Sequence, residues 1–196
     1  MVDSVRPLRN AASLILVRGE PLEVLMVRRH ARASFASSYV FPGGVVEPDD
    51  ADDAWLPRLI GADTLSRPER AARIAACRET FEETQILVAV DPQSGVTTGR
   101  HTWHGMSFFD GLSASGLYLD LSRLIPFVHW IMPDGVPRRF DTRFYITTAP
   151  PEQDGASDGV EITDLNWTEP AIGVEEALTG SRHLYFPTLA NLELLS

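Results

Sequence analysis

The chain has 196 residues, of which 44% are hydrophobic and 22% are charged. This size and composition fit one soluble globular domain with a core of its own, or two very small domains. The formal net charge is -10, so releasing counterions from a polynucleotide would gain the chain little, and we expect no nucleic-acid partner. A small phosphate-rich ligand remains compatible with this charge if a metal ion or local arginines invert it at the site.

Cysteine usage and hydropathy exclude further classes of protein. The chain has 1 cysteine, Cys77, which rules out an internal disulfide, makes a structural zinc site improbable and favours a cytoplasmic location. The apolar run at 11–17 is too short to span a membrane, so we expect no membrane partner. The one Gly-x-Ser-x-Gly match, at 155–159, lies in a segment expected to be a polar loop and not a strand-to-helix elbow, and no Walker A motif occurs, which argues against serine hydrolases and P-loop enzymes.

The first part of the chain predicts strands followed by an insertion. Apolar runs at 12–17 and 23–28 flank a turn that contains Gly19 and Pro21, which predicts a hairpin. Residues 28–38 predict a loop, and 39–41 a short strand that ends at Pro42-Gly43-Gly44. Residues 51–67 have no long periodic pattern and predict an insertion with one short helical turn.

A helix is predicted from Ser66 onward. Ser66-x-x-Glu69 is a capping-box pattern, and four alanines between 71 and 76 favour the helix. Ile74, Cys77 and Phe81 share one face at about 100° per residue, so that face should contact the core.

The second half mixes strands and helices without strict alternation. We expect strands at 86–90, 128–132, 139–148 and 161–167, helical or irregular segments at 105–112 and 119–124, a polar loop at 150–159, and helices at 174–178 and 188–195. The pattern predicts a single domain over 1–196 of the α+β class, as an α/β/α sandwich with a mixed central sheet.

The segment Arg78-Glu79-Thr80-Phe81-Glu82-Glu83 carries the most informative pattern. Spacings of three and four residues place Glu79, Glu82 and Glu83 on one flank of the helix, beside the core face. Arg78 can pair with Glu82 four residues on. Hard carboxylate oxygens suit Mg²⁺ or Mn²⁺ better than zinc. A solvated helix face is the alternative interpretation of these charges.

These residues resemble the box of the Nudix hydrolase family, G-x5-E-x7-R-E-U-x-E-E-x-G-U with U aliphatic. Gly44 and Asp50 fit its start, with Asp in place of Glu, and residues 78–86 fit its end, with Gln85 in place of the last glycine. The arginine follows the glycine by 14 positions in the motif and by 78 − 44 = 34 positions here, so about 20 residues are inserted. A long insertion at this place, together with matching segments around Arg139 and in the C-terminal part, resembles the branch that contains the mammalian peroxisomal coenzyme A diphosphatase.

The resemblance implies a Mg²⁺-dependent or Mn²⁺-dependent hydrolysis of a diphosphate bond in a nucleoside diphosphate linked to another group. It implies that Glu79, Glu82, Glu83 and the backbone carbonyl of Gly43 hold the metal, and that Arg78 orients the glutamates. Glu79, Glu82 or a loop acid such as Glu161 is then the general base.

The sequence leaves the substrate and its contacts open. Coenzyme A or an acyl-coenzyme A leads through the branch resemblance, and ADP-ribose or a nucleotide sugar is the alternative. Arg139 and Arg143 alternate with apolar residues on one strand, and they either bind a substrate phosphate or cover an ordinary half-exposed strand. Arg28, Arg29 and Arg32 are further candidate phosphate ligands in a segment that also fits a solvated loop.

Two more alternatives concern the class of protein and its assembly. A non-catalytic ligand sensor on the same fold is the rival to an enzyme, although this chain keeps the three box glutamates. The insertion at 51–67 can shape specificity or form a homodimer contact, and the sequence does not choose between these roles.

Overall fold

The computed structural model describes residues 7–30, 37–96, 99–136, 138–157 and 159–196. A seven-stranded sheet has the order β3-β2-β1-β8-β7, with β4 added to β1 and β9 added to β2. β1 and β8 run parallel, whereas the other strand pairs are antiparallel, so the sheet is mixed as predicted. The strands are β1 (Arg9–Arg18), β2 (Glu23–Arg29), β3 (Tyr39–Val40), β4 (Gly43–Val45), β7 (Ile125–Ile131), β8 (Phe140–Thr148) and β9 (Ile162–Thr168).

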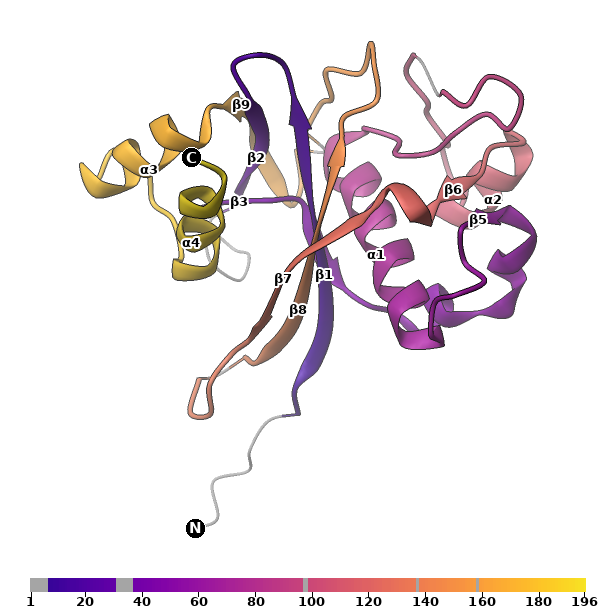
Figure 1. Ribbon diagram of the computed structural model, residues 1–196, viewed down its shortest axis with the longest axis horizontal. Helices are drawn as coiled ribbons and strands as arrows, with labels where there is room; N and C mark the ends of the chain where they lie inside the picture. The colour runs from indigo at the N-terminus through magenta and orange to yellow at the C-terminus, as the bar shows by residue number, and fades with distance from the viewer. Residues whose placement is uncertain (1–6, 31–36, 97–98, 137, 158) are drawn as a thin grey trace.

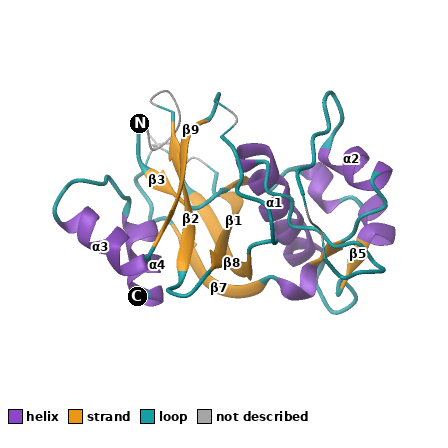
Figure 2. Ribbon diagram, turned by 90° about the horizontal axis from the view of Figure 1, so that it is seen from above, coloured by secondary structure: helices purple, strands orange, loops and turns teal. Residues whose placement is uncertain are grey.

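Helices cover both faces of this sheet (Figures 1 and 2). The long helix α1 (Arg67–Thr84) lies on one face, and α3 (Pro170–Leu178) and α4 (Phe186–Leu195) lie on the other. Successive side chains of β1 point to opposite faces of the sheet, so this strand contributes to a hydrophobic core on each face. Leu14 and Leu16 lie in the core under α1, and Ile15 lies in the core under α4. The predicted α/β/α sandwich is confirmed.

Local sequence signals define α1 well. The Ser66 hydroxyl accepts a hydrogen bond from the backbone N–H of Glu69 at 3.4 Å, and a proline occupies the first turn. Ile74 and Cys77 are fully buried, and Phe81 packs against the same core, which confirms the predicted face. Among the described residues no helix is both long enough and apolar enough to cross a membrane.

The insertion contains more structure than the single helical turn predicted from the sequence. The 3-10 helix η1 (Pro48–Ala51) ends at the first residue of the insertion, and the insertion itself forms the 3-10 helix η2 (Asp53–Arg58) and a short strand, β5 (Leu59–Ile60), that pairs in parallel with β6 (Leu119–Asp120). Trp55 is 4% exposed. Its ring centroid lies 5.9 Å from that of Phe108 and 4.8 Å from that of Phe109, the first two residues of α2 (Phe108–Ala114). A third 3-10 helix, η3 (Leu121–Arg123), follows β6 directly.

The prediction of a strand at 86–90 is wrong. Ile86 and Leu87 are fully buried, but the one strand-like pairing in this segment is an isolated bridge between Val90 and Tyr118. The side chain of Gln153 takes the place of a neighbouring strand: it accepts from Leu87 N at 2.7 Å and donates to Leu87 O at 3.3 Å. The strands predicted at 12–17, 23–28, 128–132, 139–148 and 161–167 are present, each with ends shifted by a few residues.

Trp55→Ala should lower the free energy of unfolding by about 3 to 5 kcal/mol, because it leaves a cavity between the insertion and α2. Urea denaturation followed by far-ultraviolet circular dichroism measures this loss. The matched control is Leu56→Ala, one residue away and 47% exposed, which should change the value by less than about 1 kcal/mol. Equal losses for both variants would show that the insertion is not anchored through Trp55.

Candidate metal and diphosphate site

The three box glutamates lie in the C-terminal half of α1, with unequal exposure. The Glu82 side chain is 48% exposed and that of Glu79 16%, whereas that of Glu83 is 4% exposed. Helical spacing brings the three together as predicted. The burial of Glu83 exceeds the expectation of a flank beside the core, because β4 covers this part of the helix.

The glycine turn contacts α1 at two neighbouring points. The N–H of Gly43 donates a hydrogen bond to Glu83 Oε2 at 3.1 Å. A Cβ atom at Gly44 would lie 2.4 Å from the carboxylate of Glu79, so this approach requires glycine. Gly43 is restricted by the sheet instead, because a Cβ atom at this position would lie 2.4 Å from the backbone oxygen of Ala12 on β1. The sheet thus brings the two ends of the motif into contact.

Arg78 connects the acidic residues of the site. Its Nε and Nη2 bind Oδ1 and Oδ2 of Asp50 at 2.9 and 3.0 Å, which is a two-pronged ion pair. Its Nη1 binds Glu79 at 2.9 Å and Glu82 at 3.0 Å, and Nη2 also donates to the backbone oxygen of Val45 at 3.1 Å. The predicted pairing with Glu82 is therefore present, and the shorter Asp50 still reaches the arginine.

Burial shifts the acidity of these groups. Desolvation raises the pKa of Glu83 to about 8, although the charge of Arg29 and the N–H of Gly43 oppose this rise. Desolvation also raises the pKa of Glu79 and of Glu82, against the opposing effect of Arg78. For Arg78 itself burial lowers the pKa, but the hydrogen bonds and charge of Asp50 outweigh it and raise the pKa. At Glu83 the cost of burial therefore outweighs the compensation that Arg29 and the Gly43 N–H provide.

Two residues near the glutamates come from other elements. Arg29, at the end of β2, forms an ion pair with Glu83 at 3.7 Å. Glu161, just before β9, is close enough to act on the charges of both Glu79 and Glu83. The sequence suggested Glu161 only as one candidate base, and it named Arg29 as a candidate phosphate ligand alongside Arg28. Arg32, named with them, lies outside the described residues. No sequence signal separates the two arginines, because a β-bulge at this point interrupts the alternation of β2.

The remaining predicted arginines lie in different surroundings. Arg28 is exposed, with its guanidinium 6.0 Å from the ring of Tyr39. Arg139 binds Asp134 at 2.9 Å and the backbone oxygen of Pro133 at 3.2 Å, so it closes the turn between β7 and β8. None of these contacts tests phosphate binding, which stays a prediction for both.

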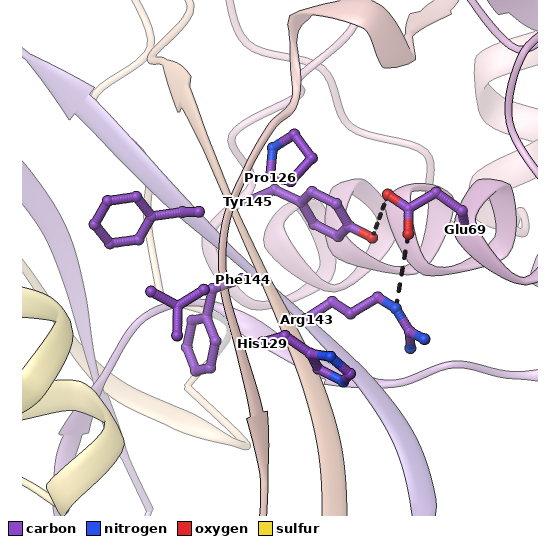
Figure 3. A pocket seen from close by; sticks show the side chains of 8 residues that line it. Glu69, Pro126, His129, Arg143, Phe144 and Tyr145 are labelled. Carbon is purple, nitrogen blue, oxygen red and sulfur yellow. Dashed lines mark hydrogen bonds and ion pairs between the residues drawn. The ribbon is translucent and has the colours of Figure 1, made fainter.

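Arg143 lies in a cavity of about 400 Å³ beside the N-terminal end of α1 (Figure 3). Its side chain and the hydroxyl of Tyr145 both point to Glu69, at 3.6 and 3.0 Å. Glu69 lies 79 − 69 = 10 residues before Glu79 on α1, which is roughly 15 Å along the helix axis. A second cavity of about 450 Å³ is lined in part by Val90, Arg123 and Thr147. The box glutamates line neither cavity.

Gln85 adopts the backbone conformation for which the motif uses glycine. Its φ is 58° and its ψ 16°, and its N–H donates to Phe81 O at 2.7 Å, so the helix ends in a left-handed cap. The side-chain oxygen accepts hydrogen bonds from Arg100, including one at 3.1 Å from Nε. The replacement therefore leaves the helix end in place.

The donor set can be tested against a divalent cation. Among the residues that the structure describes, no three His, Cys, Asp or Glu side chains are arranged as a ready-made metal site, and Arg78 engages two of the glutamates. Yet Glu83 Oε1 is buried and has no hydrogen-bond partner among the described residues. A buried carboxylate oxygen with hard neighbours is the type of ligand that Mg²⁺ and Mn²⁺ take.

Comparison with known proteins gives a consistent result. A model of the NUDIX domain family matches residues 7–178. The chain is 32% identical over 199 residues to putative nudix hydrolase 7 of Caenorhabditis elegans, covering 96% of this chain and 60% of that protein. It is 28% identical over 241 residues to acyl-coenzyme A diphosphatase NUDT19 of Gallus gallus, covering 87% and 63%. The chain thus spans 60% and 63% of the length of these two relatives.

A solved structure shows the same arrangement. The crystal structure of a NUDIX hydrolase from Alicyclobacillus acidocaldarius superposes with a TM-score of 0.85 at 28% sequence identity, covering 96% of this chain and 91% of that one.

Substitutions at the two glycines should separate folding from the site. Gly43→Ala should destabilise the protein by about 1 to 3 kcal/mol, because the new methyl group meets the backbone of β1. Gly44→Ala should leave stability nearly unchanged but weaken Mn²⁺ binding, because the methyl group displaces only the end of the Glu79 side chain. Urea denaturation and calorimetric titration with Mn²⁺ measure the two effects. Equal destabilisation by both variants would contradict this geometry.

The pKa of Glu83 predicts a pH dependence of stability without metal. The carboxyl has a pKa of about 8 when folded and 4.5 ordinarily, so the folded state binds the extra proton between these values. The favourable contribution of the Glu83 carboxyl to the free energy of unfolding is therefore largest below pH 4.5 and is lost as the pH rises through 8. The unfolding free energy of wild type minus that of Glu83→Gln, measured in chelator from pH 5 to 9, should fall up to about pH 8 and then level off. A flat difference curve would refute this.

Proposed function

Because this chain belongs to the NUDIX domain family, we propose that it hydrolyses the diphosphate bond of a nucleoside diphosphate linked to a second group, with Mg²⁺ or Mn²⁺ as its cofactor. The observation that carries the proposal is the contact between the glycine turn and α1. There a buried Glu83 and a half-buried Glu79 meet Gly43 and Gly44, with Arg78 alongside.

The oxygen donors around this contact fit a divalent cation. Glu79, Glu82, Glu83 and the backbone carbonyl of Gly43 would hold it. When bound, the cation neutralises the diphosphate and lowers the pKa of an attacking water. The unpartnered Glu83 oxygen and its raised pKa both support this assignment, since each describes a carboxylate short of positive charge.

The chain's own residues have distinct roles in this proposal. Arg78, anchored on Asp50, fixes the positions of Glu79 and Glu82 and limits their mutual repulsion. Glu79, Glu82 or Glu161 accepts the proton of the attacking water as general base. Arg28 remains a candidate ligand for a substrate phosphate. Arg143, on β8 near the N-terminal end of α1, would contact a distal part of an extended substrate rather than the diphosphate itself.

Coenzyme A or an acyl-coenzyme A is the substrate that we favour. The support is the long insertion between the two box halves together with the 28% identity to an acyl-coenzyme A diphosphatase over 87% of this chain. ADP-ribose or a nucleotide sugar is the alternative within the same chemistry. A non-catalytic sensor is disfavoured because the chain keeps all three box glutamates. Cytoplasmic location and a homodimer contact through the insertion stay predictions.

The test is incubation with Mg²⁺ and each of coenzyme A, an acyl-coenzyme A, ADP-ribose and a nucleotide sugar, with products identified by mass spectrometry. We expect cleavage between the two phosphorus atoms, fastest with a coenzyme A substrate. Metal-independent tight binding without cleavage of any substrate would support the sensor instead.

Glu82→Gln and Glu83→Gln should each reduce turnover by about a hundredfold or more while the protein stays folded. Glu193→Gln is the matched control, an exposed glutamate in α4 on the opposite face of the sheet, and it should keep the wild-type rate. Steady-state kinetics and circular dichroism measure rate and fold. Wild-type rates for both box variants would falsify the metal assignment.

A further inference from the structure

Arg29 occupies a boundary position between the buried Glu83 and solvent. Its Nη1 lies 3.7 Å from Glu83 Oε1, and its side chain is 19% exposed against 4% for Glu83. Glu161 and Glu79 also act on the charge of Glu83. The neighbouring Arg28 is exposed and lies over Tyr39 instead. Arg29 is therefore the cation that the fold places on the most buried of the box glutamates.

The contact between Arg29 and Glu83 is an ion pair without a matching hydrogen bond. A separation of 3.7 Å is too long for a charged hydrogen bond, which spans roughly 2.7 to 2.9 Å. In the described part of the chain, both Arg29 Nε and Glu83 Oε1 are buried without a hydrogen-bond partner. A buried ion pair offsets the cost of desolvation only if hydrogen bonds satisfy its remaining atoms. Arg29 and Glu83 can therefore each exchange this contact for one with better hydrogen-bond geometry.

We infer that Arg29 is an exchangeable counter-ion: it holds Glu83 while no divalent cation is bound, and it transfers to the substrate diphosphate when a cation takes its place. A carboxylate oxygen is a preferred ligand of Mg²⁺, and the planar guanidinium fork matches phosphate oxygens. The exchange leaves one positive group on Glu83 at every stage and brings the arginine to the substrate only after the cation is bound. This inference rests on the proposed function.

The first experiment compares thermal unfolding of wild type and Arg29→Gln in chelator and in saturating Mg²⁺, at one ionic strength and at about pH 9, where the Glu83 carboxyl is ionised. In chelator, the variant should melt about 5 °C or more below wild type, because Glu83 loses its counter-charge. In Mg²⁺ the difference should shrink to about 1 °C, because the cation replaces the arginine. The matched control Arg28→Gln removes the same charge one residue away and should match wild type in both conditions.

The second experiment measures calorimetric binding of methylenediphosphonate, a diphosphate that cannot be hydrolysed. With Mg²⁺ present, Arg29→Gln should bind it about tenfold more weakly than wild type, whereas in chelator the two should bind equally. Arg123→Gln, which removes an exposed arginine paired with Asp120, controls for net charge and should bind like wild type.

The outcomes separate the two proposals. If Mg²⁺ shifts the melting temperature of neither wild type nor variant, the proposed function fails and the exchange fails with it. If Mg²⁺ binds wild type but the melting difference for Arg29→Gln is the same with and without it, Arg29 stays on Glu83 and only the exchange is overturned. Unchanged methylenediphosphonate affinity in Mg²⁺ overturns it as well.

Discussion

The ion pair between Arg78 and Asp50 is the interaction on which the site depends. Asp50 is 2% exposed and lies in η1, after the glycine turn, whereas Arg78 lies on α1, so their two hydrogen bonds clamp the two halves of the motif together. Removing one partner would leave the other charge buried and uncompensated, which is costly. Because Asp50 takes one edge of the guanidinium, Nη1 remains for Glu79 and Glu82. A single side chain thus sets the spacing of two glutamates.

The sheet supplies what the helix alone cannot. β4 pairs with β1 so that Gly43 lies opposite Ser13 and Gly44 opposite Ala12, directly beneath α1. Because Gly43 and Gly44 have no side chains, their backbone approaches the carboxylates of Glu83 and Glu79 closely. The same closeness excludes water from Glu83 and raises its pKa, so the feature that creates the site also makes it unfavourable for negative charge. A cation, whether an arginine or a metal ion, resolves this conflict.

The long insertion leaves this arrangement intact because it folds outward. Its buried Trp55 packs on Phe108 and Phe109, and its short strand pairs with β6, so the extra residues form a lateral unit beside α1 (Figure 1). Gly44 and Glu79 end in contact despite the inserted residues between them. Loop length costs little free energy once both ends are held by packed elements. The insertion therefore leaves the contact between the glycine turn and α1 undisturbed.

The sequence by itself determined the features that depend on neighbours along the chain. Helical spacing placed Glu79, Glu82 and Glu83 together and paired Arg78 with Glu82, and alternation of apolar residues located most strands, because these are relations over a few residues. Only the tertiary structure decided that Glu83 is buried, that Arg29 rather than Arg28 faces it, and that Gln153 completes the backbone of Leu87. Each of these contacts joins elements that are far apart in the sequence. A β-bulge or a covering strand changes which side chain is buried or which one faces the site, so no local sequence pattern predicts these contacts.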